Sequence, residues 1–367
     1  MRILVAPDKF AGTLTAVQAA EAIARGWLRR CPHDVITCRP MSDGGPGFVD
    51  VLHEVLGGEL SVGTVTGPLG ESTPVTLLLA HGTAYVESAQ AVGLHLVAPE
   101  DRDPERTSSR GVGEAVLAAV AAGARRIVVG LGGTASNDGG AGMLAALGAT
   151  ADCDLSRGPQ GLSGVTEVDL DPAVRRLAGV ELIAATDVEA TLTGLFGATK
   201  QFGPQKGIAE ERLPVVDGWL QVWAAATDRK LATEKGAGAA GGLGFALMLL
   251  GATQVSGLDL VAESVGLAEQ IAECDVVVTG EGAFDFSSRS GKVPYGVAAR
   301  AVAGLRPCVV LAGQVLVGAR EMRALGIESA YSISELVGVE QSMTAPADSL
   351  AALAERVART WGGRTGV

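Results

Sequence analysis

Residues Arg125–Ala149 read RRIVVGLGGTASNDGGAGMLAALGA, and this stretch decides the fold. The β-branched run Ile127–Val129 predicts a buried strand, and Met143–Leu147 predicts a helix. Between them lie six glycines and four polar residues, Thr134, Ser136, Asn137 and Asp138. Glycines let backbone amides approach a ligand closely, and the start of a helix favours an anion. The stretch therefore predicts a strand, a ligand-binding loop and a helix.

A second loop of the same type lies upstream. Asp43-Gly44-Gly45-Pro46-Gly47 repeats the pattern of Asp138-Gly139-Gly140-Ala141-Gly142, again between a strand-like and an apolar helical stretch. Open α/β sheets bind ligands at such junctions. The structural alternative is a helix start, in which the aspartate caps free amides and the glycines form the turn. The glycines favour a functional loop, because a cap needs none and each ordered glycine costs roughly 0.5 to 1 kcal/mol.

Composition sets the class of protein. The chain has 367 residues, of which 47% are hydrophobic, so it can bury a large core and is long enough for two domains. The net charge of −12, without a basic run, argues against nucleic acid and membrane surfaces as partners. Five scattered cysteines form no disulfide framework, and neither an export leader nor a long apolar run occurs. We expect a soluble cytoplasmic protein, with a homodimer as one option for its oligomeric state.

The two ends of the chain alternate strands with helices. Strands are predicted at residues 3–6 and 35–38 near the N-terminus, with helices after them. The C-terminal part repeats this pattern, with strands predicted at 276–278, 309–312 and 331–333. The fold class expected is α/β, with one doubly wound, mostly parallel sheet built from both ends of the chain.

The middle of the chain has a different pattern. From Leu60 onward, apolar and polar residues alternate in three short runs up to Glu87, which predicts antiparallel hairpins. Helices are predicted at 109–122 and 213–226, and a strand at 181–185. We therefore expect a Rossmann-like domain of residues 1–60 and 269–367, and an inserted α/β domain of residues 61–268 that contains the hairpins.

Polar side chains follow six of the predicted strands. Parallel strands present their carboxyl ends at one edge of a sheet, so residues far apart in sequence can converge there. In chain order they are Asp8 with Lys9, Ser42 with Asp43, Ser136 with Asn137 and Asp138, Asp187, Glu281 with Asp285, and Gln314. A predicted loop after Asp187 also carries two lysines, Lys200 and Lys206.

The motifs disfavour several reaction classes. Gly130–Ala135 fits the dinucleotide pattern G-x-G-x-x-G/A, but that helix should begin at the third glycine, whereas Ser136-Asn137-Asp138 follows here. The four histidines have no zinc-ligand spacing, and neither a G-x-S-x-G elbow nor a P-loop motif occurs. Glycine loops, acids and lysines remain. They are the components of phosphoryl transfer, in which amides and lysines neutralise phosphate, acids hold Mg²⁺ and one acid takes a proton.

Six motifs resemble, in order and over nearly the whole chain, those of type I glycerate kinases. They are Ala6–Phe10, Pro40–Gly45, Gly132–Gly140, Phe202–Gly207, Gly236–Gly242, and Thr279–Gly282 with Gly291–Pro294. The resemblance implies a kinase that phosphorylates D-glycerate with ATP and Mg²⁺, typically at the 2-hydroxyl, in a cleft between two domains.

With this resemblance, roles follow for the loop residues. Asp187 is expected to take the hydroxyl proton or to hold the metal, with Lys206 keeping its carboxylate ionised; Asp43, the third catalytic residue, and Asp138 are the rivals for this role. The expected nucleotide-binding residues are Gly132, Gly133, Ser136, Asn137, Asp138, Gly139, Gly140, Gly280, Glu281, Gly282 and Lys292. The expected substrate-binding residues are Asp8, Lys9, Ser42 and Asp285. The expected metal ligands are Asp43, Asp138 and Glu281.

The chain departs from the family pattern at three places. Ala11 stands where a lysine is frequent, Asp187-Val188-Glu189-Ala190 replaces Asp-Val-Thr-Asn, and Ala283-Phe284-Asp285 replaces Arg-Ile-Asp. The aspartates persist, while the positive charges at positions 11 and 283 are lost. Two alternatives stay open: an NAD(P)-dependent oxidoreductase acting on a small hydroxy acid, and a non-catalytic small-acid sensor.

Overall fold

The computed structural model describes residues 1–285 and 292–363, and its contacts divide the chain into two units. The first comprises Met1–Asp43, Asp50–Leu56 and Leu258–Val367, and the second comprises Gly44–Val49 and Gly57–Gly257. The limits expected from the sequence, 60/61 and 268/269, differ from this division over residues 57–60, 258–268 and 44–49. Strand pairing accounts for the first difference, because Glu59 and Leu60 already pair with Leu79 and Leu78 in the second unit.

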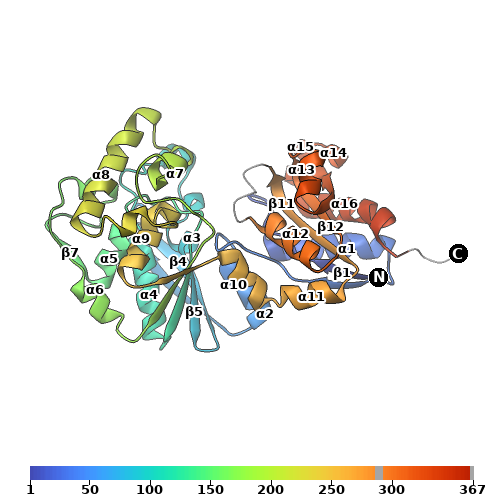
Figure 1. The fold of residues 1–367 in the computed structure, drawn as a ribbon, viewed down its shortest axis with the longest axis horizontal. Coiled ribbons are helices and arrows are strands. Elements are labelled where there is room, and N and C mark those ends of the chain that lie inside the picture. The colour runs from blue at the N-terminus through green and yellow to red at the C-terminus, as the bar shows by residue number, and fades with distance from the viewer. Residues whose placement is uncertain (286–291, 364–367) are drawn as a thin grey trace. The chain divides into compact units, whose positions relative to one another are not determined.

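The first unit is built on a five-stranded sheet in the order β13-β12-β11-β1-β2 (Figure 1). Its strands are β1 (Arg2–Val5), β2 (Val35–Cys38), β11 (Val276–Phe284), β12 (Cys308–Val315) and β13 (Ile327–Ser332). All pairings are parallel, and β1 pairs with β11 so that Ile3 lies opposite Val276. The predicted parallel sheet built from both ends of the chain is confirmed.

One face of this sheet is covered by the first and last helices of the chain, α1 (Ala16–Arg30) and α16 (Pro346–Trp361). The start of α1 is a capping box, in which the side chains of Thr15 and Gln18 each accept a hydrogen bond from the other's backbone amide. The other helices are α2 (Phe48–Leu56), α10 (Gly257–Ser264), α11 (Leu267–Glu273), α12 (Val293–Ala303), α13 (Ala319–Ala324), α14 (Ile333–Val337) and α15 (Val339–Thr344).

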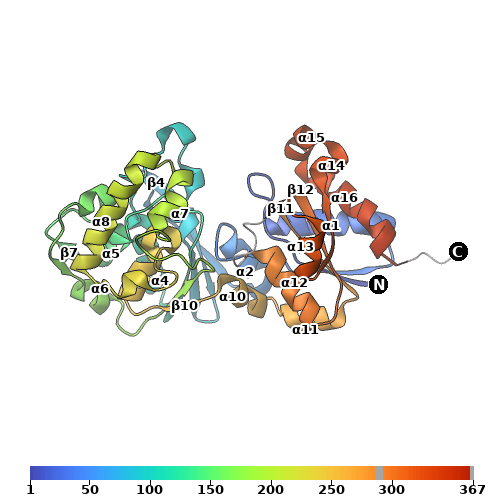
Figure 2. The same cartoon turned by 45° about the horizontal axis from the view of Figure 1, so that its top comes forward.

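The second unit contains a six-stranded sheet in the order β10-β9-β6-β5-β4-β3 (Figure 2). Its strands are β3 (Glu59–Thr66), β4 (Ser72–Ala80), β5 (Thr83–Glu87), β6 (Arg126–Gly130), β9 (Glu181–Ala185) and β10 (Thr253–Val255). Only the pairings of β4 are antiparallel, which confirms the predicted hairpins. The carboxyl ends of the other five strands therefore share one edge.

Helices of the second unit pack around a large apolar core that includes the fully buried Trp223. They are α3 (Ser88–Val92), α4 (Arg110–Ala121), α5 (Ala141–Leu147), α6 (Asp171–Arg176), α7 (Ala198–Lys206), α8 (Leu213–Ala226) and α9 (Leu243–Leu249). The peripheral stretch after α5 adds two short strands, β7 (Thr150–Ala151) and β8 (Val168–Asp169).

Helix α7 corrects the prediction of a loop with two lysines. Pro204 lies within this helix, whose buried residues include Ala198, Thr199 and Lys206. Tertiary burial therefore outweighs the local preference of glycine and proline. Over the described parts of the chain, no helix is long and apolar enough to cross a membrane.

Candidate active site

Near the carboxyl edge of the five-stranded sheet, the loop after β1 continues to pair with β11. The amide of Ala6 donates to the Val278 carbonyl at 2.7 Å, and the amide of Asp8 donates to the Gly280 carbonyl at 2.8 Å. The pairing thus continues beyond β1 and places Asp8 beside Gly280 and Glu281. The loop after β2 is tied to the same edge, because the Met41 amide donates to the Pro7 carbonyl at 2.9 Å.

Lys9 lies between two of the predicted carboxylates. Its Nζ is 3.6 Å from Asp8 Oδ1 and 4.0 Å from Asp43 Oδ1. Burial raises the pKa of Asp8 to about 6, although Lys9 opposes the rise; the charge of Asp43 adds to it. A carboxylate with a pKa near 6 can take and release a proton close to neutral pH. Ser42, next to Asp43, is buried at 1% exposure.

A second lysine bridges two carboxylates at the end of β11. Lys292 Nζ is 3.8 Å from Glu281 Oε2 and 3.9 Å from Asp285 Oδ1. Glu281 is buried, whereas about a third of the Lys292 and Asp285 side chains is exposed. The first unit therefore holds two clusters of one lysine and two acids, on neighbouring strands of one sheet.

An apolar cavity of about 260 Å³ opens at this same edge. Its wall includes Phe10, Gly282, Gln314 and Met343. Ala11 and Ala283, the two positions where the chain departs from the family's basic residues, also line it. The departures thus leave this wall uncharged.

In the second unit, the loop after β6 is organised around the Asp138 carboxylate. This side chain is fully buried and accepts four hydrogen bonds, from Ser109 N and Oγ at 2.8 Å each, from Gly140 N at 3.1 Å and from Gly142 N at 3.2 Å. Burial raises the pKa of Asp138, and these four donors act against the rise. The predicted role of Asp138 as a metal ligand is a poor fit, because protein donors already use its oxygens.

The glycines of this loop pack against the protein itself. Gly139 and Gly140 have φ of +63° and +73°, and an added Cβ would lie 2.6 Å from Trp223 Cδ1 and 2.3 Å from Ala246 Cβ, respectively. A Cβ on Gly133 would lie 2.7 Å from Pro46 Cγ, and one on Gly132 would lie 2.9 Å from Gly45 Cα. The structure thus supports the turn-forming alternative for Gly139 and Gly140.

Lys206 is the buried cation of this loop. Only 4% of the residue is exposed, and its Nζ donates to the Ser136 carbonyl at 2.5 Å. Burial lowers the pKa of Lys206 to about 7, and the charge of Asp138 opposes this shift. A cation whose pKa lies so low gains stability from a nearby anion.

A cavity of about 110 Å³ lies beside Lys206, with Gly132, Gly133 and Thr134 in its wall. Two polar atoms of the loop, Ser136 Oγ and Asn137 Oδ1, are buried and have no hydrogen-bond partner among the residues described. Buried polar atoms without partners are rare in native proteins. Ser136 Oγ and Asn137 Oδ1 are therefore able to bond a ligand near the buried lysine.

Asp187 follows β9 and is half-buried. Its neighbour Thr186 donates its amide to the Val255 carbonyl at 3.0 Å, and Val188 lines the cavity beside Lys206. The carboxylate that acts on the pKa of Lys206 is Asp138. The predicted ion pair of Lys206 with Asp187 stays a prediction.

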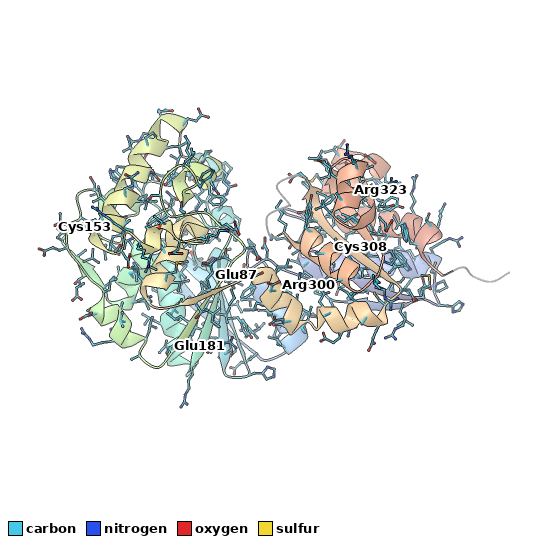
Figure 3. All side chains as sticks on the ribbon, viewed as in Figure 1. Glu87, Cys153, Glu181, Arg300, Cys308 and Arg323 are labelled. Atoms are coloured by element: carbon cyan, nitrogen blue, oxygen red, sulfur yellow. The ribbon has the colours of Figure 1, made fainter. Side chains whose placement is uncertain are left out.

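Sequence reasoning missed three residues that hold the loops in place. Ser109, predicted only as a helix start, is the main donor to Asp138. Thr199 Oγ1 accepts a hydrogen bond from Asn137 Nδ2 at 2.9 Å. Glu87, at the end of β5, accepts the amides of Gly47 at 3.1 Å and Val49 at 3.3 Å (Figure 3). The only signal in the sequence for these three residues was that each is polar and lies in or next to a predicted helix, strand or loop.

The carboxylates of the candidate site suit a hard divalent cation better as pairs than as a larger cage. Within residues 1–285 and 292–363, no three His, Cys, Asp or Glu side chains form a metal cage. Mg²⁺ is commonly held by one or two carboxylates together with phosphate and water oxygens, so pairs of acids fit it. Asp43 beside Asp8 and Glu281 beside Asp285 are such pairs.

Fold and site together define an α/β enzyme with lysine and carboxylate clusters at the strand ends. The sequence model of the glycerate kinase family matches residues 3–362. The chain belongs to this family, so it is an enzyme, a kinase that transfers a phosphoryl group to an alcohol. The resemblance seen in the sequence is confirmed.

Named relatives agree with this assignment. The chain is 39% identical to a glycerate kinase of Bacillus subtilis, over 91% of this chain and 90% of that one. It is 36% identical to a glycerate 2-kinase of Escherichia coli, over 98% of both chains. A solved structure of a glycerate kinase 2 from Salmonella typhimurium aligns with a TM-score of 0.80 at 34% identity, over 98% of both chains.

The packing of Gly139 predicts the effect of adding a methyl group. Gly139→Ala should lower the free energy of unfolding by roughly 2 to 4 kcal/mol, because the new Cβ meets Trp223 and the backbone is left-handed. Gly164→Ala is the control, since Gly164 has φ +79° with no atom within 4 Å of an added Cβ. Denaturant unfolding measures both. If Gly139→Ala lowered the free energy of unfolding no more than Gly164→Ala does, the packing described here would be contradicted.

The raised pKa of Asp8 predicts a pH dependence of stability. The native carboxyl holds its proton up to about pH 6, whereas the unfolded one loses it near its ordinary value of 3.8. The contribution of Asp8 to the free energy of unfolding is therefore largest at low pH. It declines by roughly 3 kcal/mol as the pH rises from about 4 to 6.

Asp8→Asn should remove this component, so the variant gains stability relative to the parent protein as pH rises through that window. Denaturant unfolding at pH 4 and at pH 6.5 measures the difference. Glu328→Gln, at an exposed position on β13, is the control. A difference between Asp8→Asn and the parent that does not change with pH refutes the shifted pKa.

Proposed function

We propose that the chain transfers the γ-phosphoryl group of ATP to the 2-hydroxyl of D-glycerate, with Mg²⁺ as the metal. The observation that carries the proposal is the pair of clusters at one sheet edge, in which Lys9 and Lys292 each face two carboxylates. The name of the Escherichia coli relative, glycerate 2-kinase, supports the choice of hydroxyl.

The proposed reaction needs cations for phosphate and one base. The hydroxyl oxygen of glycerate forms a bond to the γ-phosphorus, the bond from that phosphorus to ADP breaks, and the hydroxyl proton passes to a carboxylate. Lys9, Lys292 and Lys206 are the lysines proposed to neutralise phosphate and carboxylate oxygens. Burial makes Lys206 the strongest candidate among them, because an anion restores the charged state that burial disfavours.

Asp187 is the proposed base. It is half-buried at the carboxyl end of β9, and the next residue lines the cavity beside Lys206. Asp43 and Asp8 are its rivals, and Asp8 has the advantage of a pKa near 6. Ser42 and Asp285 complete the proposed glycerate-binding residues with Asp8 and Lys9.

We propose that Asp43 and Glu281 hold Mg²⁺; each of their carboxylates lies within 4 Å of a lysine. When bound, the ion would offset the negative charge of the phosphate groups. For Asp138 we propose a loop-organising role in place of metal binding. Gly139 and Gly140 then serve nucleotide binding only through the loop they shape.

The other proposed nucleotide contacts are Gly132, Gly133, Ser136, Asn137, Gly280, Glu281, Gly282 and Lys292. The unused acceptors Ser136 Oγ and Asn137 Oδ1 support a ligand beside this loop. The location of the site in a cleft between domains, the cytoplasmic location and the homodimer stay predictions from the sequence.

Turnover should require ATP, D-glycerate and Mg²⁺ together. In a coupled assay for ADP, the purified chain should consume ATP only with D-glycerate present, and excess EDTA should stop the reaction, because acids without histidine ligands favour a hard oxygen-binding ion. Phosphorus NMR of the product identifies the hydroxyl. ATP consumption independent of glycerate, or full activity in EDTA, rules the proposal out.

Replacement of Asp187 tests the assignment of the base. Asp187→Asn should lower kcat by roughly 10² or more with a smaller change in KM for ATP, as expected when a general base is lost. Asp43→Asn is the matched comparison, because the loss of a metal ligand should raise the Mg²⁺ concentration needed for half-maximal rate. Near-normal kcat in folded Asp187→Asn would move the base to Asp43 or Asp8.

A further inference from the structure

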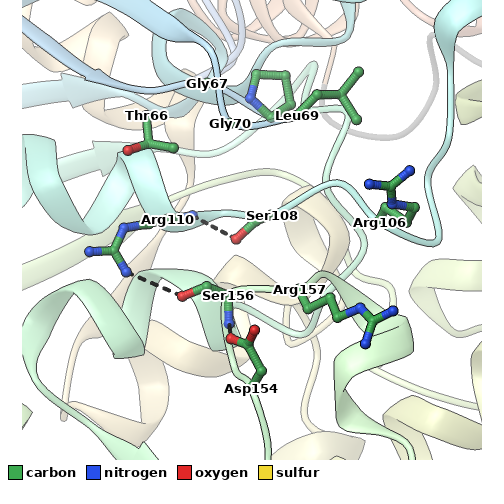
Figure 4. A pocket seen from close by; sticks show the side chains of 11 residues that line it. Thr66, Gly67, Leu69, Gly70, Arg106, Ser108, Arg110, Asp154, Ser156 and Arg157 are labelled. Atoms are coloured by element: carbon green, nitrogen blue, oxygen red, sulfur yellow. Dashed lines mark hydrogen bonds between the residues drawn. The ribbon is translucent and has the colours of Figure 1, made fainter.

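A cavity of about 270 Å³ in the second unit is lined by three arginines (Figure 4). Three segments form it: Thr66–Gly70 after β3, the segment from Arg106 to Arg110 at the start of α4, and the segment from Asp154 to Arg157. It shares no lining residue with the cavity beside Lys206. The kinase chemistry proposed above makes no use of it.

Hydrogen bonds and one close approach hold these segments together. The amide of Ser108 donates to the Pro68 carbonyl at 2.9 Å, and Arg110 donates a guanidinium hydrogen bond to Ser156 Oγ at 3.2 Å. Gly158 has φ +72°, and an added Cβ would lie 2.6 Å from the carbonyl carbon of Arg106. Only glycine permits this contact, which keeps Arg157 close to Arg106 in the fold.

The arginines are only partly neutralised. Arg110 forms an ion pair with Glu114 at 2.9 Å, and Arg106 lies 3.9 Å from Asp103. Among the residues described, the Arg157 guanidinium has no hydrogen bond or ion pair. Asp154 is the one acid in the wall, and its Oδ1 accepts the Ser156 amide at 3.0 Å. Three cations and one acid meet here in a chain whose net charge is −12.

We propose that this cavity binds a small organic anion carrying a phosphate group. Guanidinium groups present paired donors that match phosphate oxygens, and they are less strongly hydrated than ammonium groups. Ser108 and Ser156 add hydroxyl donors, and the start of the twelve-residue helix α4 adds positive potential. Arg157, which has no ion-pair partner among the residues described, supplies a positive charge that can pair with a phosphate monoester, whose charge is about −1.5 to −2 at neutral pH.

Site-resolved NMR of the full chain tests the proposal. With ¹⁵N-labelled arginine, the Nε signals of Arg106, Arg110 and Arg157 should shift and saturate on titration with glycerol 3-phosphate. Inorganic phosphate should give the same shifts at higher concentration, and glycerol or chloride at matched ionic strength should give none. Saturation by inorganic phosphate at equal or lower concentration overturns the assignment of an organic phosphate.

Substitutions provide the second test. Arg157→Gln should weaken glycerol 3-phosphate binding by roughly tenfold or more, because it removes charge-assisted hydrogen bonds. Arg176→Gln, at an exposed position on α6, should change it less than twofold. Basal kinase turnover should be unchanged in Arg157→Gln, so this result does not depend on the proposed reaction. Equal weakening by the two variants, or binding that survives in Arg106→Gln/Arg157→Gln, overturns the proposal.

Discussion

The second unit depends on one buried interaction, the Asp138 carboxylate with its four donors. A carboxylate without exposure to solvent is stable only when hydrogen bonds replace its hydration. Ser109 supplies two of them and the loop amides of Gly140 and Gly142 supply the others. The loop after β6 is thereby fixed to the start of α4, and its shape follows from that attachment.

The two glycine loops show that one sequence pattern can have two structural outcomes. Both read Asp-Gly-Gly-x-Gly. Asp138 turns inward and organises its own loop, whereas the Asp43 side chain is 31% exposed and lies beside Lys9. In the upstream loop, Glu87 from β5 accepts the amides of Gly47 and Val49. A separate acid thus supports the backbone of the upstream loop.

Local patterns predicted the elements well because strand and helix periodicity is a local property. Residues 35–38, 181–185 and 213–226 form elements with the predicted bounds. The clustering of Asp8, Asp43, Glu281 and Lys292 also followed, because parallel strands align their carboxyl ends. The burial of Asp138 and Gly139 did not follow, because it depends on Ser109 and Trp223, whose sequence separations of 29 and 84 residues lie outside any local pattern. Lys206 was misplaced for the same reason, since tertiary packing makes its segment a helix.

The free energy of unfolding of Asp138→Asn, measured without nucleotide and compared with that of Asp43→Asn, tests this account most directly. Loss of the charge and of one acceptor from a fully paired buried carboxylate should cost roughly 2 to 4 kcal/mol. Asp43→Asn should cost less than about 1 kcal/mol, as expected for a partly exposed ion pair. The opposite result, an Asp138→Asn protein of native stability whose only defect is a higher Mg²⁺ requirement, would make Asp138 a metal ligand and contradict the central claim.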